Sequence, residues 1–123
     1  MEFLALVYGD PDTWEGLSQD ERSDAYEAYV AVSRDAAAAG ALVDASELES
    51  TTAATSVRVR NGDAVVTDGP YAEVKESLGG YYLFSCDSIE EAIQWAARIP
   101  SAWHGGAVEV RPVHGATDGE AAA

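Results

Sequence analysis

Ionisable side chains are concentrated in one short stretch, residues 68–76 (DGPYAEVKE), which holds three carboxylates, one ammonium and one phenol. Aspartate before Gly-Pro is a turn signal, and the residue before a proline is restricted to extended geometry. The backbone of this connection is therefore expected to be rigid. Rigid loops between regular elements often carry binding or catalytic groups, so the stretch is a candidate functional site.

Three of its side chains could handle protons or charge. Asp68 is either a general base, or a group that orients one, or a cap for the turn through bonds to nearby backbone amides. Glu73 and Lys75 lie two positions apart and point the same way in an extended chain. On the surface they would form a weak ion pair. If buried, Lys75 could bind a carboxylate, phenolate or phosphate, and Glu73 could transfer a proton.

Two tyrosines and one histidine complete the candidate set. Tyr71 is expected to place its hydroxyl at the rim of a cavity that Tyr8 also lines, although core packing explains both rings equally well. His104, in a loop beside Trp103, is either an acid–base group or an ordinary surface histidine. The predicted catalytic residues are thus Asp68, Glu73 and His104, and the predicted ligand-binding residues are Tyr8, Tyr71 and Lys75.

Other kinds of site lack support in the sequence. The two histidines, His104 and His114, have no partner motif with metal-ligand spacing, and no metal or other cofactor is expected. The single cysteine, Cys86, ends an apolar strand and is interpreted as a buried small hydrophobe. No phosphate-binding glycine loop or serine-nucleophile elbow occurs.

Composition narrows the class of protein. The 123 residues suit one globular domain, predicted over residues 1–114 with a flexible tail at 115–123. The net charge of −15 disfavours nucleic acid and anionic membranes as partners. No apolar run is long enough to cross a bilayer and no secretory signal is visible, so a cytoplasmic location is expected.

In the first half of the chain, residues 2–8 form an apolar run that predicts a buried strand. A loop containing Trp14 and Leu17 should then fold back on the core. Ser18 and Glu21 make a capping box that starts a helix to about residue 39. Its apolar stripe is predicted to consist of Ala25, Tyr29, Val32 and Ala36, widened by Tyr26 and Val30.

The second half predicts a strand at 41–48, followed by four more strands and a helix. Residues 55–60 and 63–67 flank Asn61-Gly62, a strong hairpin signal. An apolar strand follows at 78–85. A second capping box at 88–91 starts a helix that ends before Pro100, and residues 107–113 alternate as a last strand.

Two strand–helix–strand units in one short chain favour an α+β fold of the ferredoxin-like kind, with an inserted β-hairpin. Both helices should cover one face of an antiparallel sheet. The strands at residues 3–8 and 81–84 are apolar on both sides, so a second copy is expected to cover the other face. A homodimer is therefore predicted.

Four separated motifs resemble the YCII-related family: residues 8–10 (YGD), 65–76 (VVTDGPYAEVKE), 79–82 (GGYY) and 109–113 (EVRPV). The similarity is strongest to the branch named for its Asp-Gly-Pro-Phe motif, with Tyr71 in place of the phenylalanine. The resemblance covers about residues 1–113. It implies a dimeric α/β barrel and, in some relatives, acid–base catalysis by a histidine–aspartate pair. The expected helix at 18–40 contains no histidine for that role.

Three functions remain open. The chain is either an enzyme-like domain that binds a small polar or aromatic molecule, or a non-catalytic ligand sensor, or a plain dimerisation module. The resemblance also implies a link to extracytoplasmic-function sigma factors, because genes of this branch often neighbour them. The first function is favoured by the acid–base residues of the 68–76 stretch.

Overall fold

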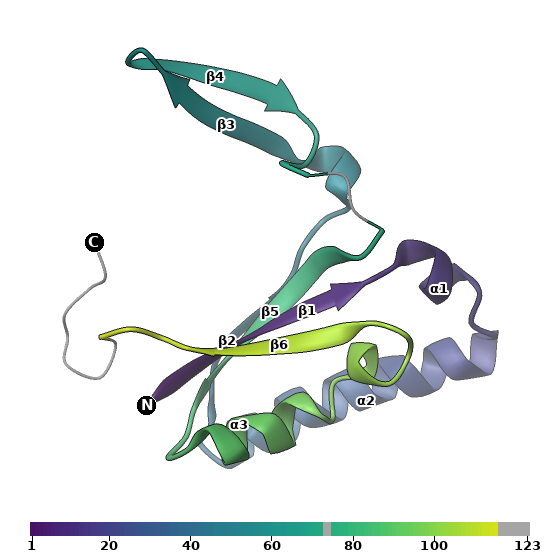
Figure 1. The fold of residues 1–123 in the computed structure, drawn as a ribbon. Helices are drawn as coiled ribbons and strands as arrows, with labels where there is room; N and C mark the ends of the chain where they lie inside the picture. Colours follow the sequence, from purple (N-terminus) through teal and green to yellow (C-terminus); the bar gives the residue numbers. More distant parts are fainter. Residues whose placement is uncertain (73–74, 116–123) are drawn as a thin grey trace.

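A computed structural model describes residues 1–72 and 75–115, in which two helices cover one face of an antiparallel four-stranded sheet (Figure 1). The sheet order is β2-β5-β1-β6, and a separate hairpin pairs β3 with β4. This arrangement confirms the predicted ferredoxin-like α+β fold. The strands are β1 Glu2–Gly9, β2 Leu42–Glu47, β3 Thr55–Arg60, β4 Asp63–Asp68, β5 Ser77–Ser85 and β6 Ala107–Pro112. The helices are α1 Pro11–Glu15, α2 Gln19–Ala38 and α3 Ile89–Ala96, with 3-10 turns at Thr51–Ala53 (η1) and Pro100–Ala102 (η2).

The core lies between the sheet and α2 and is built on alternate residues of the central strand β1. Phe3, Ala5 and Val7 are buried beneath the helices, while the residues between them are only half-buried. Tyr82 and Phe84 of β5 stack with ring centroids 5.6 Å apart in the same layer. Because side chains alternate along a strand, the other face of the sheet carries the second apolar set and has no helix over it.

Helix α2 begins as its sequence predicts. The Ser18 hydroxyl accepts from the Glu21 amide, and the Glu21 carboxylate accepts from the Ser18 amide. The predicted widening of its apolar stripe is wrong: Tyr26 and Val30 are 68% and 47% exposed. Each residue directly follows a residue of the stripe, and one position along a helix is a rotation of about 100°. Because only a narrow stripe of the helix contacts the sheet, this rotation turns both side chains away from it. In the described part of the chain no helix is long and apolar enough to cross a membrane.

Two local expectations need correction. The segment around Trp14 was expected to be a loop but forms the short helix α1, which Asp10 caps and Pro11 opens. At α3 the Ser88 hydroxyl accepts from the Glu91 amide as predicted, whereas the Glu91 carboxylate bonds the amide of Asp87 instead of closing the capping box. Both differences concern the side chains that cap the start of a helix, because such a bond can form at alternative positions one or two residues apart.

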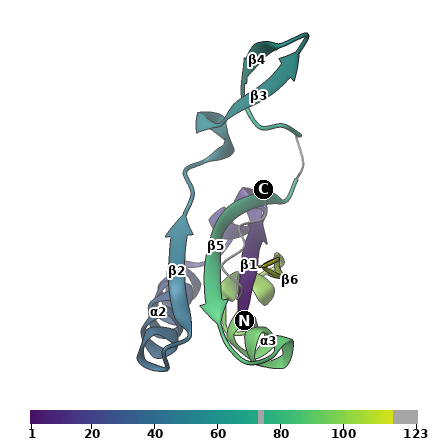
Figure 2. The same ribbon diagram turned by 90° about the vertical axis from the view of Figure 1, so that its left-hand side faces the viewer.

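The hairpin of β3 and β4 forms around Asn61-Gly62, which the sequence predicted. Asn61 and Gly62 adopt φ values of 53° and 82°, the left-handed geometry that a tight two-residue turn requires. The hairpin is an extension between β2 and β5 that stands away from the helices and the sheet (Figure 2). Every residue of β4 is exposed.

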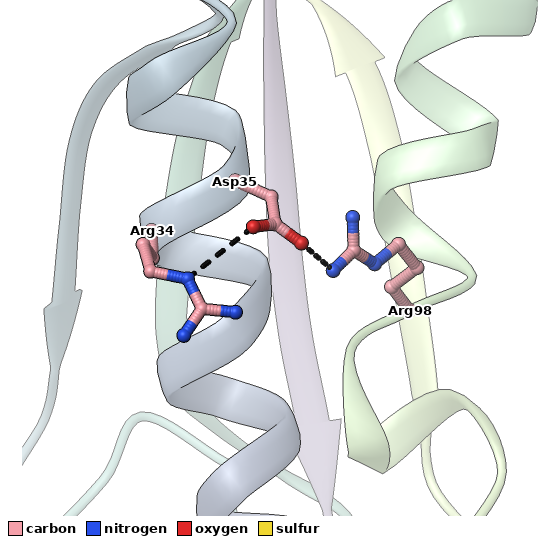
Figure 3. Close-up of polar contacts among 3 residues, drawn as sticks. All are labelled: Arg34, Asp35 and Arg98. Atoms are coloured by element: carbon pink, nitrogen blue, oxygen red, sulfur yellow. Dashed lines mark hydrogen bonds and ion pairs between the residues drawn. The ribbon is translucent and has the colours of Figure 1, made fainter.

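An ion-pair network joins α2 to the end of α3 (Figure 3). The carboxylate of Asp35 accepts from Arg98 Nη2 at 2.5 Å and from Arg34 Nε at 3.4 Å. The hydrogen bond from Arg98, more than that from Arg34, holds the pKa of Asp35 below its ordinary value. The group therefore stabilises the fold above the pKa of the unfolded chain, and this contribution is lost as pH falls through the folded pKa.

Replacing Asp35 with asparagine tests this linkage. At neutral pH the Asp35→Asn variant is expected to unfold at lower urea concentration than the wild type, because the bond to Arg98 loses its charge. The difference should shrink as pH falls below about 4, the ordinary pKa of an aspartate, and vanish only below the lowered pKa of folded Asp35, where the wild-type carboxylate is also neutral. Urea midpoints at several pH values measure it. Asp24→Asn, an exposed carboxylate of the same helix, is the control, and an equal effect there would contradict the assignment.

Candidate functional site

A small cavity of about 50 Å³ lies where β1 ends, between the following segment, α2 and the chain that leads into β6. A volume of this size has room for a few water molecules or a ligand group of similar size. Its walls combine polar and aromatic side chains. They are formed by Gly9, Asp10, Trp14, Leu17, Tyr29, Pro100, Ser101, His104 and Gly106.

Asp10 reaches the cavity because β1 delivers it there and α1 begins immediately after it. One carboxylate oxygen, Oδ1, accepts from the Asp12 amide at 2.9 Å and caps α1. The other, Oδ2, lies 3.9 Å from Lys75 Nζ. The Asp10 side chain is only 11% exposed and that of Lys75 is 83% exposed. A largely covered carboxylate thus meets a mobile, solvated ammonium at the mouth of the cavity.

Two hydroxyl groups form a second polar wall. Tyr29 of α2 and Ser101 of η2 lie 2.9 Å apart, and either oxygen can donate to the other. Tyr29 belongs to the apolar stripe of the helix, so its ring packs near the core while its hydroxyl reaches the cavity. The pair ties the helix to the loop that carries the histidine.

His104 is half-buried, and its Nε2 atom is fully buried with no hydrogen-bond partner among the described residues. Its ring lies against that of Trp103, with centroids 4.5 Å apart. Hydrogen bonding to Ser18 holds the pKa of Glu21 below its ordinary value, and the nearby imidazole of His104 lowers it further. An unpaired buried nitrogen normally finds a partner, so this atom is available to a ligand or a water molecule.

The loop that carries His104 (the histidine loop) lies very close to the backbone at the end of β1. A methyl group placed on Gly106 would collide with the carbonyl oxygen of Tyr8 and lie 2.9 Å from that of Ser101. Only glycine allows the loop to come this near. By contrast, a methyl group on Gly9 would meet nothing closer than the Ser101 hydroxyl at 4.0 Å.

The predicted site residues are not all brought together. His104 lines the cavity and Lys75 reaches it through Asp10. Asp68 lies at the end of β4 and is exposed, as is Tyr71, whose ring contacts the Arg58 guanidinium at 4.8 Å. Tyr8 is half-buried, next to the lining residue Gly9. Glu73 lies outside the described residues.

Sequence reasoning missed Asp10, Tyr29 and Ser101 as members of this cavity. Asp10 was interpreted as the end of a strand and as part of the motif at residues 8–10, and that motif, immediately after a buried strand, was the available signal. Tyr29 was assigned to the helix stripe without its hydroxyl being considered, and Ser101 carried no signal. Among the residues described, no group of three or more histidine, cysteine, aspartate or glutamate side chains could hold a metal ion.

Comparison with known proteins identifies the family. The sequence model of the YCII-related domain matches residues 1–116. The chain belongs to the YCII-related family. It is also 37% identical over 114 residues, 92% of each chain, to an uncharacterized protein of Rhizobium meliloti (strain 1021). These similarities cover the sheet, the helices and the cavity of this YCII-related chain, and they name no reaction.

The close approach at Gly106 gives a test of how this YCII-related domain builds its cavity. Gly106→Ala is expected to lower the free energy of unfolding by about 1–3 kcal/mol, because the histidine loop must move away from β1. Gly9→Ala, in the same wall of the cavity, should lower the free energy of unfolding by less than Gly106→Ala. Urea denaturation measures both. Equal stability of the Gly106 variant and the wild type would contradict the close packing.

Proposed function

We propose that this YCII-related protein binds a small anionic molecule at the Asp10–His104 cavity and transfers a proton to or from it. The observation that carries the proposal is His104 Nε2, a buried imidazole nitrogen without a partner in the described residues, at the wall of a cavity. An imidazole titrates near neutrality and is the commonest acid–base group in enzymes.

The surrounding groups support a proton-transfer role for His104. The Glu21 carboxylate lies near the His104 ring and the Asp10 carboxylate lines the same cavity, so both can stabilise the positive charge that forms when the ring accepts a proton. The linked hydroxyls of Tyr29 and Ser101 can donate to, or accept from, a ligand oxygen. Trp14 and Leu17 give the cavity an apolar side that limits access of water.

The expected ligand is a small carboxylate or phenolate. Lys75 pairs with the Asp10 carboxylate that lines the cavity, and its exposed ammonium can turn from Asp10 to a ligand at the mouth. The cavity itself accepts only a few heavy atoms, so the rest of the ligand must extend outward past Lys75. Asp68, Tyr71, Tyr8 and Glu73 stay predictions as further ligand or proton-transfer groups.

A screen of small carboxylates and phenols by thermal shift and imidazole NMR tests the proposal. Acetate and benzoate, which are anions at neutral pH, should bind more tightly than phenol and benzamide, which are neutral, and should shift the His104 ring signals. Lys75→Met is expected to weaken the binding of the best anion about fivefold, the effect of one exposed ion pair. Incubation in deuterated water of any hit that carries an acidic carbon–hydrogen bond, followed by mass spectrometry, detects proton exchange at that carbon.

The two histidines provide a matched control. His104→Gln should abolish exchange. His114→Gln should leave it unchanged, because His114 is exposed and lies after β6, at the other end of that strand from the cavity. Binding without exchange would support a ligand sensor instead of an enzyme. Anion binding that responds to neither Lys75→Met nor His104→Gln would contradict the assignment of this cavity.

We also propose that the protein is a homodimer formed through the face of the sheet that α2 and α3 leave open. Leu4 and Leu6 of β1 lie on this face opposite Leu83 and Tyr81 of β5, and all four are half-buried in the single chain. Four apolar side chains on adjacent strands form a patch of the kind that mediates association. A closed dimer would place two equivalent patches together.

Leu6→Lys tests the dimer. A lysine in the middle of the patch is expected to raise the dissociation constant at least about tenfold, because its charge would have to leave water. Ile93→Lys, on the exposed side of α3, should leave association unchanged. Sedimentation equilibrium measures both, with circular dichroism to verify folding. A wild-type protein that stays monomeric at all accessible concentrations would contradict the proposal.

A further inference from the structure

The β3–β4 hairpin has one apolar side that no residue in the described part of the chain covers. Register places Val57 opposite Val66, and Val59 opposite Ala64, on the same side of the ribbon. Val57 and Val66 are each 62% exposed, and Val59 is 70% exposed. Arg58 and Arg60 lie on the other side with Val65 and Asp63 as their cross-strand neighbours. The hairpin is therefore an amphipathic ribbon with its apolar side in solvent.

Among the described residues, the contacts of this ribbon with the rest of the chain lie at its base and on its arginine side. The Gly69 amide donates to the Ala54 carbonyl at 2.7 Å, and the Ser56 hydroxyl donates to the Gly69 carbonyl at 2.7 Å. On the arginine side, Arg58 contacts the Tyr71 ring. A two-stranded hairpin is at best marginally stable in water when no other surface packs on it. The exposed valine side therefore requires a partner surface.

The position of the hairpin points to the open face of the sheet as the place of that partner. In Figure 1 the hairpin leans back over the side of the sheet that is opposite to α2 and α3. Figure 2, turned by 90°, shows it continuing beyond the ends of β2 and β5. A second copy packed on the Leu4–Leu6 face would lie beside the hairpin. The hairpin and this face would then belong to one continuous interface.

Charge also favours a second copy. The segment Thr55–Asp68 holds Arg58, Arg60, Asp63 and Asp68 and is neutral, so the rest of the chain carries the whole net charge of −15. Two such acidic bodies repel each other. A neutral ribbon with an apolar side can approach an acidic copy without that repulsion.

We propose that the hairpin is an arm that packs its valine side, formed by Val57, Val59 and Val66, on a second copy of this chain. The proposal rests on the homodimer proposed above and adds a second contact to it. By two-fold symmetry each copy gives one arm and receives one. Burial of the valines supplies the partner surface that a lone hairpin lacks and strengthens the dimer.

Neutral substitutions on the two sides of the ribbon test the arm. The Val57→Gln/Val66→Gln double variant is expected to raise the dimer dissociation constant at least about tenfold, because two valine side chains would no longer bury apolar surface. Val65→Gln, on the arginine side of the same strand pair, should leave the constant unchanged. Sedimentation equilibrium measures all three proteins, and none of the substitutions alters the net charge.

Hydrogen exchange gives an independent measurement and guards against simple loss of the hairpin. Amides of residues 55–68 should exchange rapidly in dilute monomer and slowly in the dimer. A Val57→Thr/Val59→Thr/Val66→Thr variant keeps β-branched side chains and is expected to weaken association while still forming the ribbon. A wild-type dimer that the valine variants leave intact, with rapid exchange in residues 55–68, would overturn the arm alone. A wild-type monomer would overturn the dimer and the arm together.

Discussion

Burial of alternate residues of β1 is the constraint on which the rest of the structure depends. This strand lies between β5 and β6, and its Phe3, Ala5 and Val7 supply the layer on which α2 packs. Since a strand alternates its side chains, the same constraint places Leu4 and Leu6 on the opposite face. The end of β1 also fixes where Gly9 and Asp10 emerge. The core, the open face and the cavity are thus consequences of one strand.

The cavity is a product of segments that are distant in the sequence. Asp10 follows β1, Tyr29 comes from α2, and Ser101 and His104 come from the segment before β6. Their meeting depends on the close contact between Gly106 and the backbone of Tyr8 and on the Tyr29–Ser101 hydroxyl pair. A cavity built this way is held by the fold itself, so its geometry is set before a ligand arrives.

The hairpin has a different relation to the core. Its turn and register follow from local chemistry, and its strands add nothing to the buried layer of the sheet. The Asp-Gly-Pro turn at its base carries Asp68 away from the cavity, whereas Lys75, a few residues later, returns to Asp10. The same loop thus contributes residues to the mouth of the cavity and to the base of the amphipathic ribbon.

The sequence by itself determined the strands and the two longer helices, α2 and α3, but not the short helix α1. The capping residue of α2, the Asn-Gly turn and the alternating strands specified a ferredoxin-like chain with an inserted hairpin, because these signals are local and act through hydrogen bonds and side-chain periodicity. His104 and Lys75 were also identified from their chemistry alone. Only the tertiary structure decided which side chains meet. Asp10, Tyr29 and Ser101 join His104 because packing brings together residues more than seventy positions apart, and no local pattern encodes that distance. The same reason explains Tyr26, which is apolar by periodicity and yet exposed, since the width of the buried stripe depends on what α2 packs against.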